Sequence, residues 1–274
     1  MNKFLLYCII IITLGSCASG KGVGRIKKYE FAHQDVPAAF DGYKIAFISD
    51  LHYKSLFTEK RLDKLVKTLN KLNVDILLMG GDYHEGCQFV PELFEMLARV
   101  NAPDGIWAIL GNHDYNACYD EILAEMKRSN IHLLEHALDT IHRKKQQIIL
   151  AGVRNPFDLN KNGISPTNAL SPQDFVILLV HTPDYAEQVP IDNTDLVLSG
   201  HTHGGQVTMF GLYAPISRSK YGFRTGLKHN SNGVPIIVTN GVGTSNKNIR
   251  MFAPSEIVQI ILKQTDGHAD LINK

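Results

Sequence analysis

The stretch Leu196-Val197-Leu198-Ser199-Gly200-His201-Thr202-His203 places two imidazoles, two residues apart, directly after a short apolar run. Such a run predicts a buried strand, and the glycine and polar residues after it predict a loop. A single His-x-His pair is a weak signal, but four similar groups precede it, and each of them also follows a short apolar run. These groups are Asp50-Leu51-His52, Gly81-Asp82, Gly111-Asn112-His113-Asp114 and His181. The chain therefore repeatedly places potential metal ligands at the ends of predicted strands.

Strands and helices alternate through the first half of the chain. Apolar runs predict strands at residues 44–49, 74–79 and 107–110, and helical spacing predicts helices at 59–72, 91–100 and 119–129. Further strands are predicted at 148–153, 175–180, 195–199, 206–210, 235–239 and 256–262, with long loops at 155–171 and 213–232. The alternation predicts an α/β fold with a largely parallel sheet, and the strand-rich second half predicts a second sheet packed against the first.

The groups at the strand ends are expected to meet on one rim, because ligands of parallel α/β folds bind outside the carboxyl ends of the strands. The candidate metal ligands are Asp50, His52, Asp82, Asn112, His181, His201 and His203. A mixture of carboxylate, imidazole and amide donors suits divalent ions such as Mn²⁺, Fe²⁺, Zn²⁺ or Co²⁺. Seven side chains are too many for one tetrahedral ion, so the set predicts two ions that share a carboxylate.

The amino-acid composition limits the classes of protein to which the chain can belong. The chain has 274 residues, of which 44% are hydrophobic and 20% charged, as in an ordinary globular protein with a sizeable core. Its formal net charge is +1, so the sequence offers no overall electrostatic footprint for a nucleic acid partner. We expect no nucleic acid binding, and we expect a monomer.

The N-terminus has the pattern of an export signal. Lys3 precedes an apolar run at residues 4–14, which is too short to span a membrane. Leu14-Gly15-Ser16-Cys17 resembles the lipobox of bacterial lipoproteins, in which the peptide is cut before a cysteine that becomes lipidated. The sequence thus predicts a signal peptide at 1–16, a lipidated Cys17 with tether and lead-in at 17–40, and one domain at 41–274. An ordinary cleaved signal and an uncleaved anchor are the alternatives.

Only two cysteines, Cys87 and Cys118, belong to the predicted domain. They could pair in an oxidising compartment, but the sequence does not show whether they lie close enough. We expect two separate free thiols. Neither cysteine has a spacing suited to a zinc site.

The five groups, in this order, resemble the calcineurin-like metallophosphoesterase superfamily over residues 44–262. The resemblance implies a sandwich of two mixed β-sheets flanked by helices. It implies that Asp50, His52 and His203 hold one ion, that Asn112, His181 and His201 hold the second, and that Asp82 bridges them. It also implies that His113 is a non-ligand histidine facing the phosphate and that Asp114 orients its imidazole.

Two further segments narrow the resemblance. Residues 200–206 and Asn240-Gly241-Val242-Gly243-Thr244-Ser245 resemble a membrane-associated bacterial branch, which contains phosphodiesterases and lipid pyrophosphatases acting on a UDP-diacylglucosamine. Gly243, Thr244 and Ser245 either line the substrate rim or form a plain turn. Arg154, after Ala151-Gly152-Val153, either binds a substrate phosphate or solvates a loop.

The chemistry implied by the resemblance is phosphoester hydrolysis at the cell envelope, with a phosphodiester as the first substrate class, either free or linked to a lipid. Two ions about 3.5–4 Å apart stabilise the attacking and leaving oxygens, and they lower the pKa of bound water to roughly 7. The resulting hydroxide attacks phosphorus in line, and His113 gives a proton to the leaving alkoxide. A lipid pyrophosphatase is the first alternative. The second is a metal-stabilised binding protein without turnover, which would not need His113.

Overall fold

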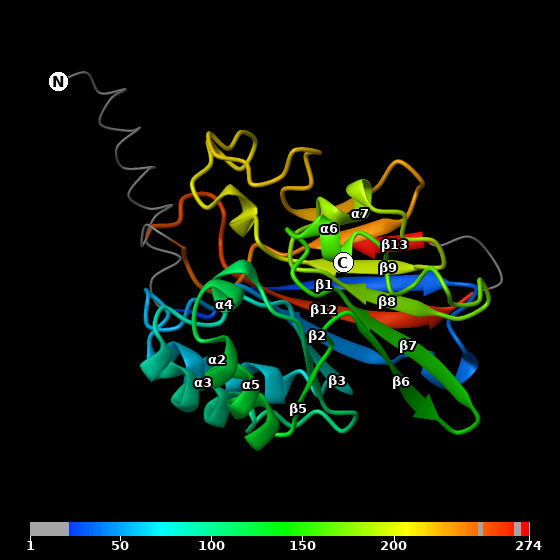
Figure 1. Cartoon of the computed structure of the whole chain (residues 1–274), viewed down its shortest axis with the longest axis horizontal. Helices are drawn as coiled ribbons and strands as arrows, with labels where there is room; N and C mark the ends of the chain where they lie inside the picture. The colour runs from blue at the N-terminus through cyan, green and yellow to red at the C-terminus, as the bar shows by residue number, and fades with distance from the viewer. Residues whose placement is uncertain (1–21, 246–248, 266–269, 274) are drawn as a thin grey trace.

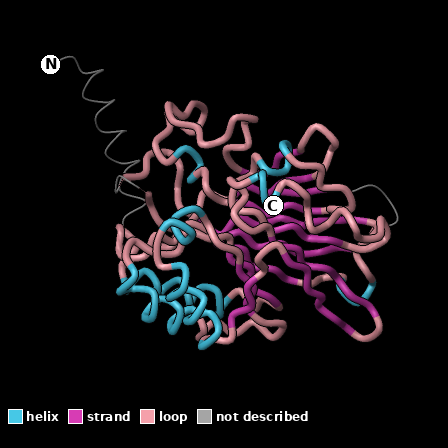
Figure 2. The backbone as a smooth tube through the Cα atoms, in the orientation of Figure 1, coloured by secondary structure: helices cyan, strands magenta, loops and turns pink. Residues whose placement is uncertain are grey.

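The computed structural model describes residues 22–245, 249–265 and 270–273, which form two stacked β-sheets with helices on their outer faces (Figures 1 and 2). The predicted signal peptide and Cys17 lie outside the described residues. Among the described residues, no helix is long and apolar enough to cross a membrane. The predicted sandwich of two mixed sheets is confirmed.

The first sheet has seven strands in the order β13-β1-β12-β2-β3-β4-β5. Its strands are β1 (Arg25–His33), β2 (Lys44–Ile48), β3 (Ile76–Met79), β4 (Ile106–Ala108), β5 (Ile131–Leu133), β12 (Glu256–Gln264) and β13 (Asp270–Asn273). Strands β2 to β5 are parallel neighbours, connected in turn by α2 (Glu59–Lys71), α3 (Val90–Leu97) and α5 (Tyr119–Arg128). Their carboxyl ends therefore meet at one edge of the sheet.

The second sheet has six strands in the order β10-β11-β9-β8-β7-β6. Its strands are β6 (Ala137–Arg143), β7 (Gln146–Gly152), β8 (Val176–Leu179), β9 (Leu196–Ser199), β10 (Gly226–His229) and β11 (Pro235–Val238). Strands β7, β8, β9 and β11 run parallel, and the edge strands β6 and β10 are antiparallel to their neighbours. The short helices are α4 (Asn112–Asn116), α6 (Leu159–Asn162), α7 (Tyr185–Gln188), η1 (Ala38–Phe40), η2 (Cys87–Phe89) and η3 (His203–Gly205).

The alternation of side chains along the strands produces three layers of core. In β2, Ile45 and Phe47 lie in the core between the two sheets, whereas Ala46 and Ile48 face the helices α2, α3 and α5. In β8, Ile177 and Leu179 face the same central core, and Leu178 packs in the outer layer with α7. Strands buried on both faces read as continuous apolar runs, which is why the sequence predicted them.

Most predicted strands and helices are confirmed to within a few residues, but the predictions for residues 25–33 and 206–210 differ from the structure, and the two predicted long loops contain α6 and β10. Residues 25–33, assigned to the lead-in, form β1, which pairs with β12 along its whole length and buries Tyr29 and Phe31. The folded domain therefore begins well before residue 41. Residues 206–210 do not form a strand, because Gln206 and Phe210 have φ values of 53° and 52°, outside the β region.

The expectation of two free thiols is wrong. Cys87 and Cys118 form a disulfide with a Cα–Cα distance of 5.3 Å. The bridge ties η2, which follows β3, to the residue that precedes α5. It closes a loop that contains α4 and the Gly111-Asn112-His113-Asp114 group. The sequence could not show this pairing, because 31 residues separate the two cysteines.

Candidate metal centre

All seven predicted ligands follow strand ends on one rim of the sandwich. Asp50 and His52 follow β2, Asp82 follows β3, and Asn112 begins α4 after β4. On the second sheet, His181 follows β8, and both His201 and His203 follow β9. The rim lies where the carboxyl ends of the two groups of parallel strands meet, which explains how residues more than 150 positions apart form one site.

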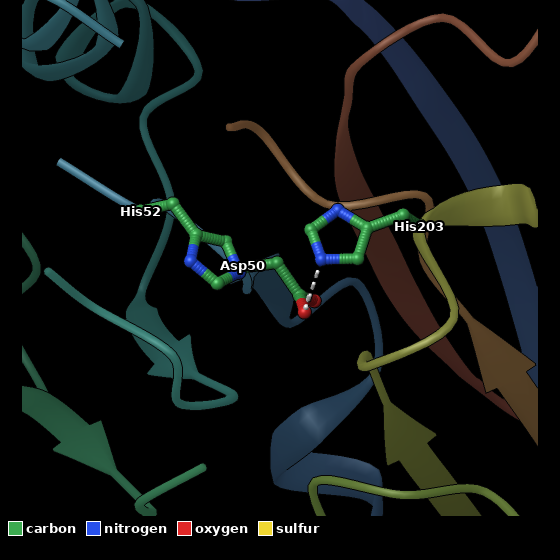
Figure 3. A group of neighbouring side chains, drawn as sticks. All are labelled: Asp50, His52 and His203. Atoms are coloured by element: carbon green, nitrogen blue, oxygen red, sulfur yellow. Dashed lines mark ion pairs between the residues drawn. The ribbon is translucent and has the colours of Figure 1, made fainter. Parts of the chain in front are cut away.

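The first group of ligands is Asp50, His52 and His203, drawn in Figure 3. All three are buried, and one potential ligand atom from each lies within 4.8 Å of the others. Nε2 of His203 lies 3.3 Å from Oδ1 of Asp50. The carboxylate of Asp50 also accepts the backbone N–H of His201, at 3.0 Å to Oδ2, so it holds the loop that carries both histidines.

The second group is Asp82, His181 and His201. Oδ2 of Asp82 lies 3.3 Å from Nε2 of His181 and 3.6 Å from Nε2 of His52, which belongs to the first group. One carboxylate oxygen therefore faces ligands of both groups. This is the position that the sequence assigned to a bridging carboxylate.

Buried polar atoms without partners test whether metal ions fit this site. Six ligand side chains each present such an atom, with no hydrogen-bond partner among the described residues: His52 Nε2, Asp82 Oδ2, Asn112 Oδ1, His181 Nε2, His201 Nδ1 and His203 Nε2. Native proteins rarely leave buried polar atoms unpaired. Here they are lone-pair donors of the types that divalent transition metals prefer, gathered at one place. The residues present therefore fit two ions.

Outer hydrogen bonds orient two of the imidazoles. Nδ1 of His52 lies 2.6 Å from Oε1 of Glu85, and Nδ1 of His181 donates to the carbonyl oxygen of Gly80 at 2.7 Å. A proton on Nδ1 leaves Nε2 free as a ligand, as is usual for metal-binding histidines. Glu85 was not among the predicted site residues, because it lies three residues after Asp82 and belongs to no recognised motif.

The charges of the site suit cation binding. Burial raises the pKa of Asp82, but the neighbouring His181 and His52 outweigh it and hold this pKa well below its usual value. Burial also lowers the pKa of His181, yet Asp82 reverses the effect and raises it to about 9. In contrast, burial followed by the charge of His181 lowers the pKa of His201 to about 3. His201 is therefore neutral, which is the form in which an imidazole binds a metal ion.

The backbone of the site is strained. Five ligand residues have positive φ: Asp50 at 54°, His52 at 43°, Asp82 at 57°, His201 at 66° and His203 at 51°. Residues other than glycine seldom adopt this region, and each instance costs on the order of 1 kcal/mol or more. Strain gathered on the ligands indicates that ligand placement, and not local preference, determines these loops.

His113 lies beside the ligands, and a ring nitrogen of His113 is within 4.8 Å of potential ligand atoms of His52 and Glu85. Its backbone N–H donates to Oδ1 of Asp82 at 2.9 Å, and its ring meets that of His52 edge-on at a centroid distance of 4.8 Å. The residue is half-buried, as are the predicted ligands Asn112 and His201, so it lies at the edge of the site. Contact of His113 with a substrate stays a prediction.

Asp114 differs from its predicted role of orienting His113. Its buried carboxylate accepts backbone N–H groups of Gly111, Asp82 and Tyr83 at 2.8, 2.7 and 3.0 Å. Burial and the nearby Asp82 raise its pKa to about 7. Asp114 therefore fixes the loop that carries the bridging carboxylate, and it acts on the site through the backbone.

The predicted substrate-rim residues lie close to the site in different ways. Gly243 donates its N–H to the carbonyl of Asp50 at 2.7 Å, and a Cβ there would lie 1.8 Å from the carbonyl oxygen of Leu51. Thr244 is buried, and its hydroxyl lies 3.4 Å from Oγ of Ser55. Gly243 is therefore required by close packing beneath Asp50.

Ser245 lines a cavity of about 420 Å³ beside His203. The wall of this cavity is mostly apolar and includes Val207, Ile216 and Ile249. Arg154 forms an ion pair with Glu135, with 3.0 Å between Nε and Oε1, and more than half of its side chain is exposed. The structure thus places Ser245 on the wall of a cavity next to a predicted ligand and gives Arg154 a carboxylate partner.

Two arginines that the sequence analysis missed are prominent here. Arg218 lines both the 420 Å³ cavity and a second one of about 360 Å³ that includes Phe157 and Thr182. Arg250 is almost wholly buried, and its guanidinium donates to backbone carbonyls of Asn240, Gly243 and Ala253, among others. Arg250 ties together the loops that hold the first ligand group.

Comparisons with known proteins agree with this geometry. A family model described as calcineurin-like phosphoesterase matches residues 43–205. An uncharacterized metallophosphoesterase of Aquifex aeolicus is 29% identical over 87% of this chain and 92% of its own length. The Bacillus subtilis metallophosphoesterase YkuE is 30% identical over 84% of this chain and 82% of its own. The crystal structure of TT1561 from Thermus thermophilus is 15% identical, with a TM-score of 0.46 over 73% of this chain and 90% of that one.

Proposed function

The chain belongs to the calcineurin-like phosphoesterase family, and on this basis we propose that it is a dinuclear metal-dependent phosphodiesterase acting at the cell envelope. The observation that carries the proposal is the set of six unpaired, buried ligand atoms, one of which is Oδ2 of Asp82. A site built only for stability would pair these atoms with protein groups, since each unpaired one costs roughly 1–3 kcal/mol. Mn²⁺, Fe²⁺, Zn²⁺ and Co²⁺ are the ions that the donor set suits.

The chain's own residues have separate tasks in the reaction. Two bound ions would supply Lewis-acid stabilisation of charge on the phosphate. Water attacks phosphorus, and the bond from phosphorus to the leaving oxygen breaks. His113, at the edge of the site, gives its proton to that oxygen. Asn112 is a neutral ligand, so it adds no negative charge to oppose an anionic substrate.

The two cavities favour a diester. They lie on either side of Arg218, one next to His203 and the other next to Phe157, whose ring meets that of His201 at 5.2 Å. A phosphate at the metal centre would thus have room for one organic group in each cavity, with the guanidinium between them. A monoester would leave one of them unused.

The apolar wall of the larger cavity favours a lipid pyrophosphatase as the second candidate. Val207, Ile216 and Ile249 offer a surface for hydrocarbon, as a UDP-diacylglucosamine-type substrate would need. A binding protein without turnover is the weakest candidate, because it gives no role to His113.

Location at the envelope rests on the N-terminal sequence and on the cysteines. Leu14-Gly15-Ser16-Cys17 resembles a lipobox, and the Cys87–Cys118 disulfide supports an oxidising compartment. We propose that lipidated Cys17 anchors the protein on an extracytoplasmic face. Cys17→Ala should abolish lipid labelling and membrane fractionation, whereas unchanged fractionation would indicate an uncleaved anchor.

Hydrolysis of bis(p-nitrophenyl) phosphate by the chain from Lys21 onward tests the catalytic proposal. Each of Mn²⁺, Fe²⁺, Co²⁺ and Zn²⁺ is added to metal-free protein, with Fe²⁺ handled anaerobically without thiols so that the disulfide survives. We expect turnover with at least one ion and none with chelator or with Asp82→Ala. Absence of turnover with all four ions would contradict the proposal that the protein is an enzyme. A panel of monoesters, diesters and lipid pyrophosphates then separates the substrate classes.

A further inference from the structure

The loop between η3 and β10 exposes a cluster of large apolar side chains beside the metal centre. The exposed residues are Met209, Phe210, Leu212, Tyr213, Ile216 and Tyr221, with Ile249 from the facing loop. Leu212 is 86% exposed and Ile216 is 72% exposed. Single exposed apolar residues are common, but a contiguous group marks a surface that meets a partner or a membrane. We call residues 209–221 together with Ile249 the apolar rim.

The backbone of the apolar rim is held in place, so these side chains do not collapse onto the core. Met209 N–H donates to the carbonyl of Tyr213 at 2.7 Å, which closes a tight turn with Leu212 near its tip. The guanidinium of Arg224 anchors this turn through the carbonyl of Gly211 at 2.6 Å. The same guanidinium donates to Gly204 in the metal loop at 2.9 Å. The apolar tip is therefore rigidly joined to the metal centre.

The segment that contains the apolar rim has only one sign of charge. No aspartate or glutamate occurs at residues 196–255, although the whole chain is almost neutral at +1. The cationic residues in this segment include Arg218 and Lys220, which lie within the rim itself. No ion pair joins either of them to a carboxylate within the described part of the chain. Protein surfaces that bind anionic membranes have this composition, in which apolar side chains lie beside basic side chains that form no ion pair.

The start of the described chain lies close to the same surface. The carbonyl of Gly22 accepts from Nε of Arg61 at 2.9 Å, and Nη2 of Arg61 donates to the carbonyl of Val242 at 3.4 Å. Ser245, three residues further on, accepts from Arg218 of the rim at 3.2 Å. Cys17 is five residues before Gly22, which is at most about 18 Å of extended chain.

We propose that the apolar rim is a second membrane contact, inserted in the interface of an anionic bilayer, which turns the metal centre toward the lipid surface. The position of the apolar rim near a membrane anchor depends on the proposed lipidation of Cys17. The apolar and basic composition of the rim does not depend on it. The 420 Å³ cavity joins the two sites, because its wall includes Ile216 and Ile249 of the rim as well as His203. A second copy of the chain fits less well, because a symmetric contact would place Arg218 and Lys220 of one copy against the same cationic residues of the other.

Tryptophan fluorescence of the full chain in vesicles tests this contact. Leu212→Trp places a probe in the rim, and Ile164→Trp, at a site that is 75% exposed on the loop near α6, is the matched control. The chain has one native tryptophan, the buried Trp107, which gives a constant background. Both substitutions replace exposed side chains, so both proteins should fold, and both carry the same N-terminal attachment.

In vesicles of phosphatidylglycerol and phosphatidylcholine, we expect the emission of Leu212→Trp to shift to shorter wavelength. Brominated acyl chains should quench it, and Ile164→Trp should be unaffected. Lys220→Gln, or vesicles of phosphatidylcholine alone, should weaken the quenching. Equal quenching of both probes, or of neither, would overturn the proposal. A short-wavelength emission that bromine does not quench would indicate a protein partner or a second copy instead. The readout requires no turnover, so it is independent of the catalytic test.

Discussion

Removal of the Cys87–Cys118 disulfide should destabilise the domain by a predictable amount. The two cysteines are separated by 31 residues. Closing a loop of this length removes about 12 cal/mol/K of entropy from the unfolded chain, which corresponds to about 4 kcal/mol at 25 °C. Alanine is the suitable replacement, because Cys118 is buried and a serine hydroxyl there would need a partner. The double variant Cys87→Ala/Cys118→Ala should lose this stabilisation.

Urea unfolding of metal-free protein measures the effect. With a slope of about 2–3 kcal/mol per molar urea, the midpoint should fall by roughly 1–2 M. Chelator is present throughout, so that metal binding does not contribute. A reductant should lower the midpoint of the parent protein toward that of the double variant and leave the variant unchanged. An equal midpoint for oxidised and reduced parent would refute the reasoning, because the loop would then already be constrained in the unfolded state.

Three further predictions concern the metal centre and a buried acid. His201→Ala and His203→Ala should each lose one ion of the two, as measured by metal analysis, because the histidines belong to different ligand groups; loss of both ions from either variant would contradict this division. His113→Ala should retain both ions and lower kcat by about 10²–10⁴-fold, whereas loss of an ion would make His113 a ligand. Burial raises the pKa of Asp195 to about 7, so this carboxyl destabilises the fold progressively as pH rises from about 4 to 7. Asp195→Asn, whose amide oxygen can still accept the N–H of Val176, should therefore have a higher Tm than the parent at pH 8 and the same Tm at pH 4; an unchanged Tm at pH 8 would refute it.

The sequence predicted the parts of the fold that depend on local periodicity. Strands such as β3, with Ile76-Leu77-Leu78-Met79, are apolar on both faces because helices cover one side and the second sheet the other. Strand β1 was missed although Tyr29 and Phe31 alternate with polar residues, because its lysines and glutamate resemble a solvated lead-in. The strand predicted at 206–210 failed for the opposite reason. Its residues Met209 and Phe210 are exposed on the apolar rim instead of buried.

At the site, too, residues that follow a local sequence pattern were predictable, and residues whose partners depend on the tertiary fold were not. Ligands such as Asp50 and His203 were predictable, because each group follows a strand and matches a known pattern. Glu85 and Arg250 were not, since their partners, the imidazole of His52 and a set of loop carbonyls, are brought to them only in the folded chain. Asp114 was placed in the correct group but given the wrong partner, because sequence spacing does not show which way a side chain points.

The positive φ angles explain why the site cannot be a product of local sequence preference. Ligands such as Asp50 and His203 adopt a conformation that isolated residues of their type avoid, and they also carry unpaired buried atoms or face them. Both features raise the free energy of the metal-free fold. Ions that bind only the folded chain would satisfy those atoms, so binding and folding are coupled. Gly243 packs tightly beneath Asp50, and Arg250 contacts loop carbonyls. Both contacts hold the strained loops in the geometry that the ions require.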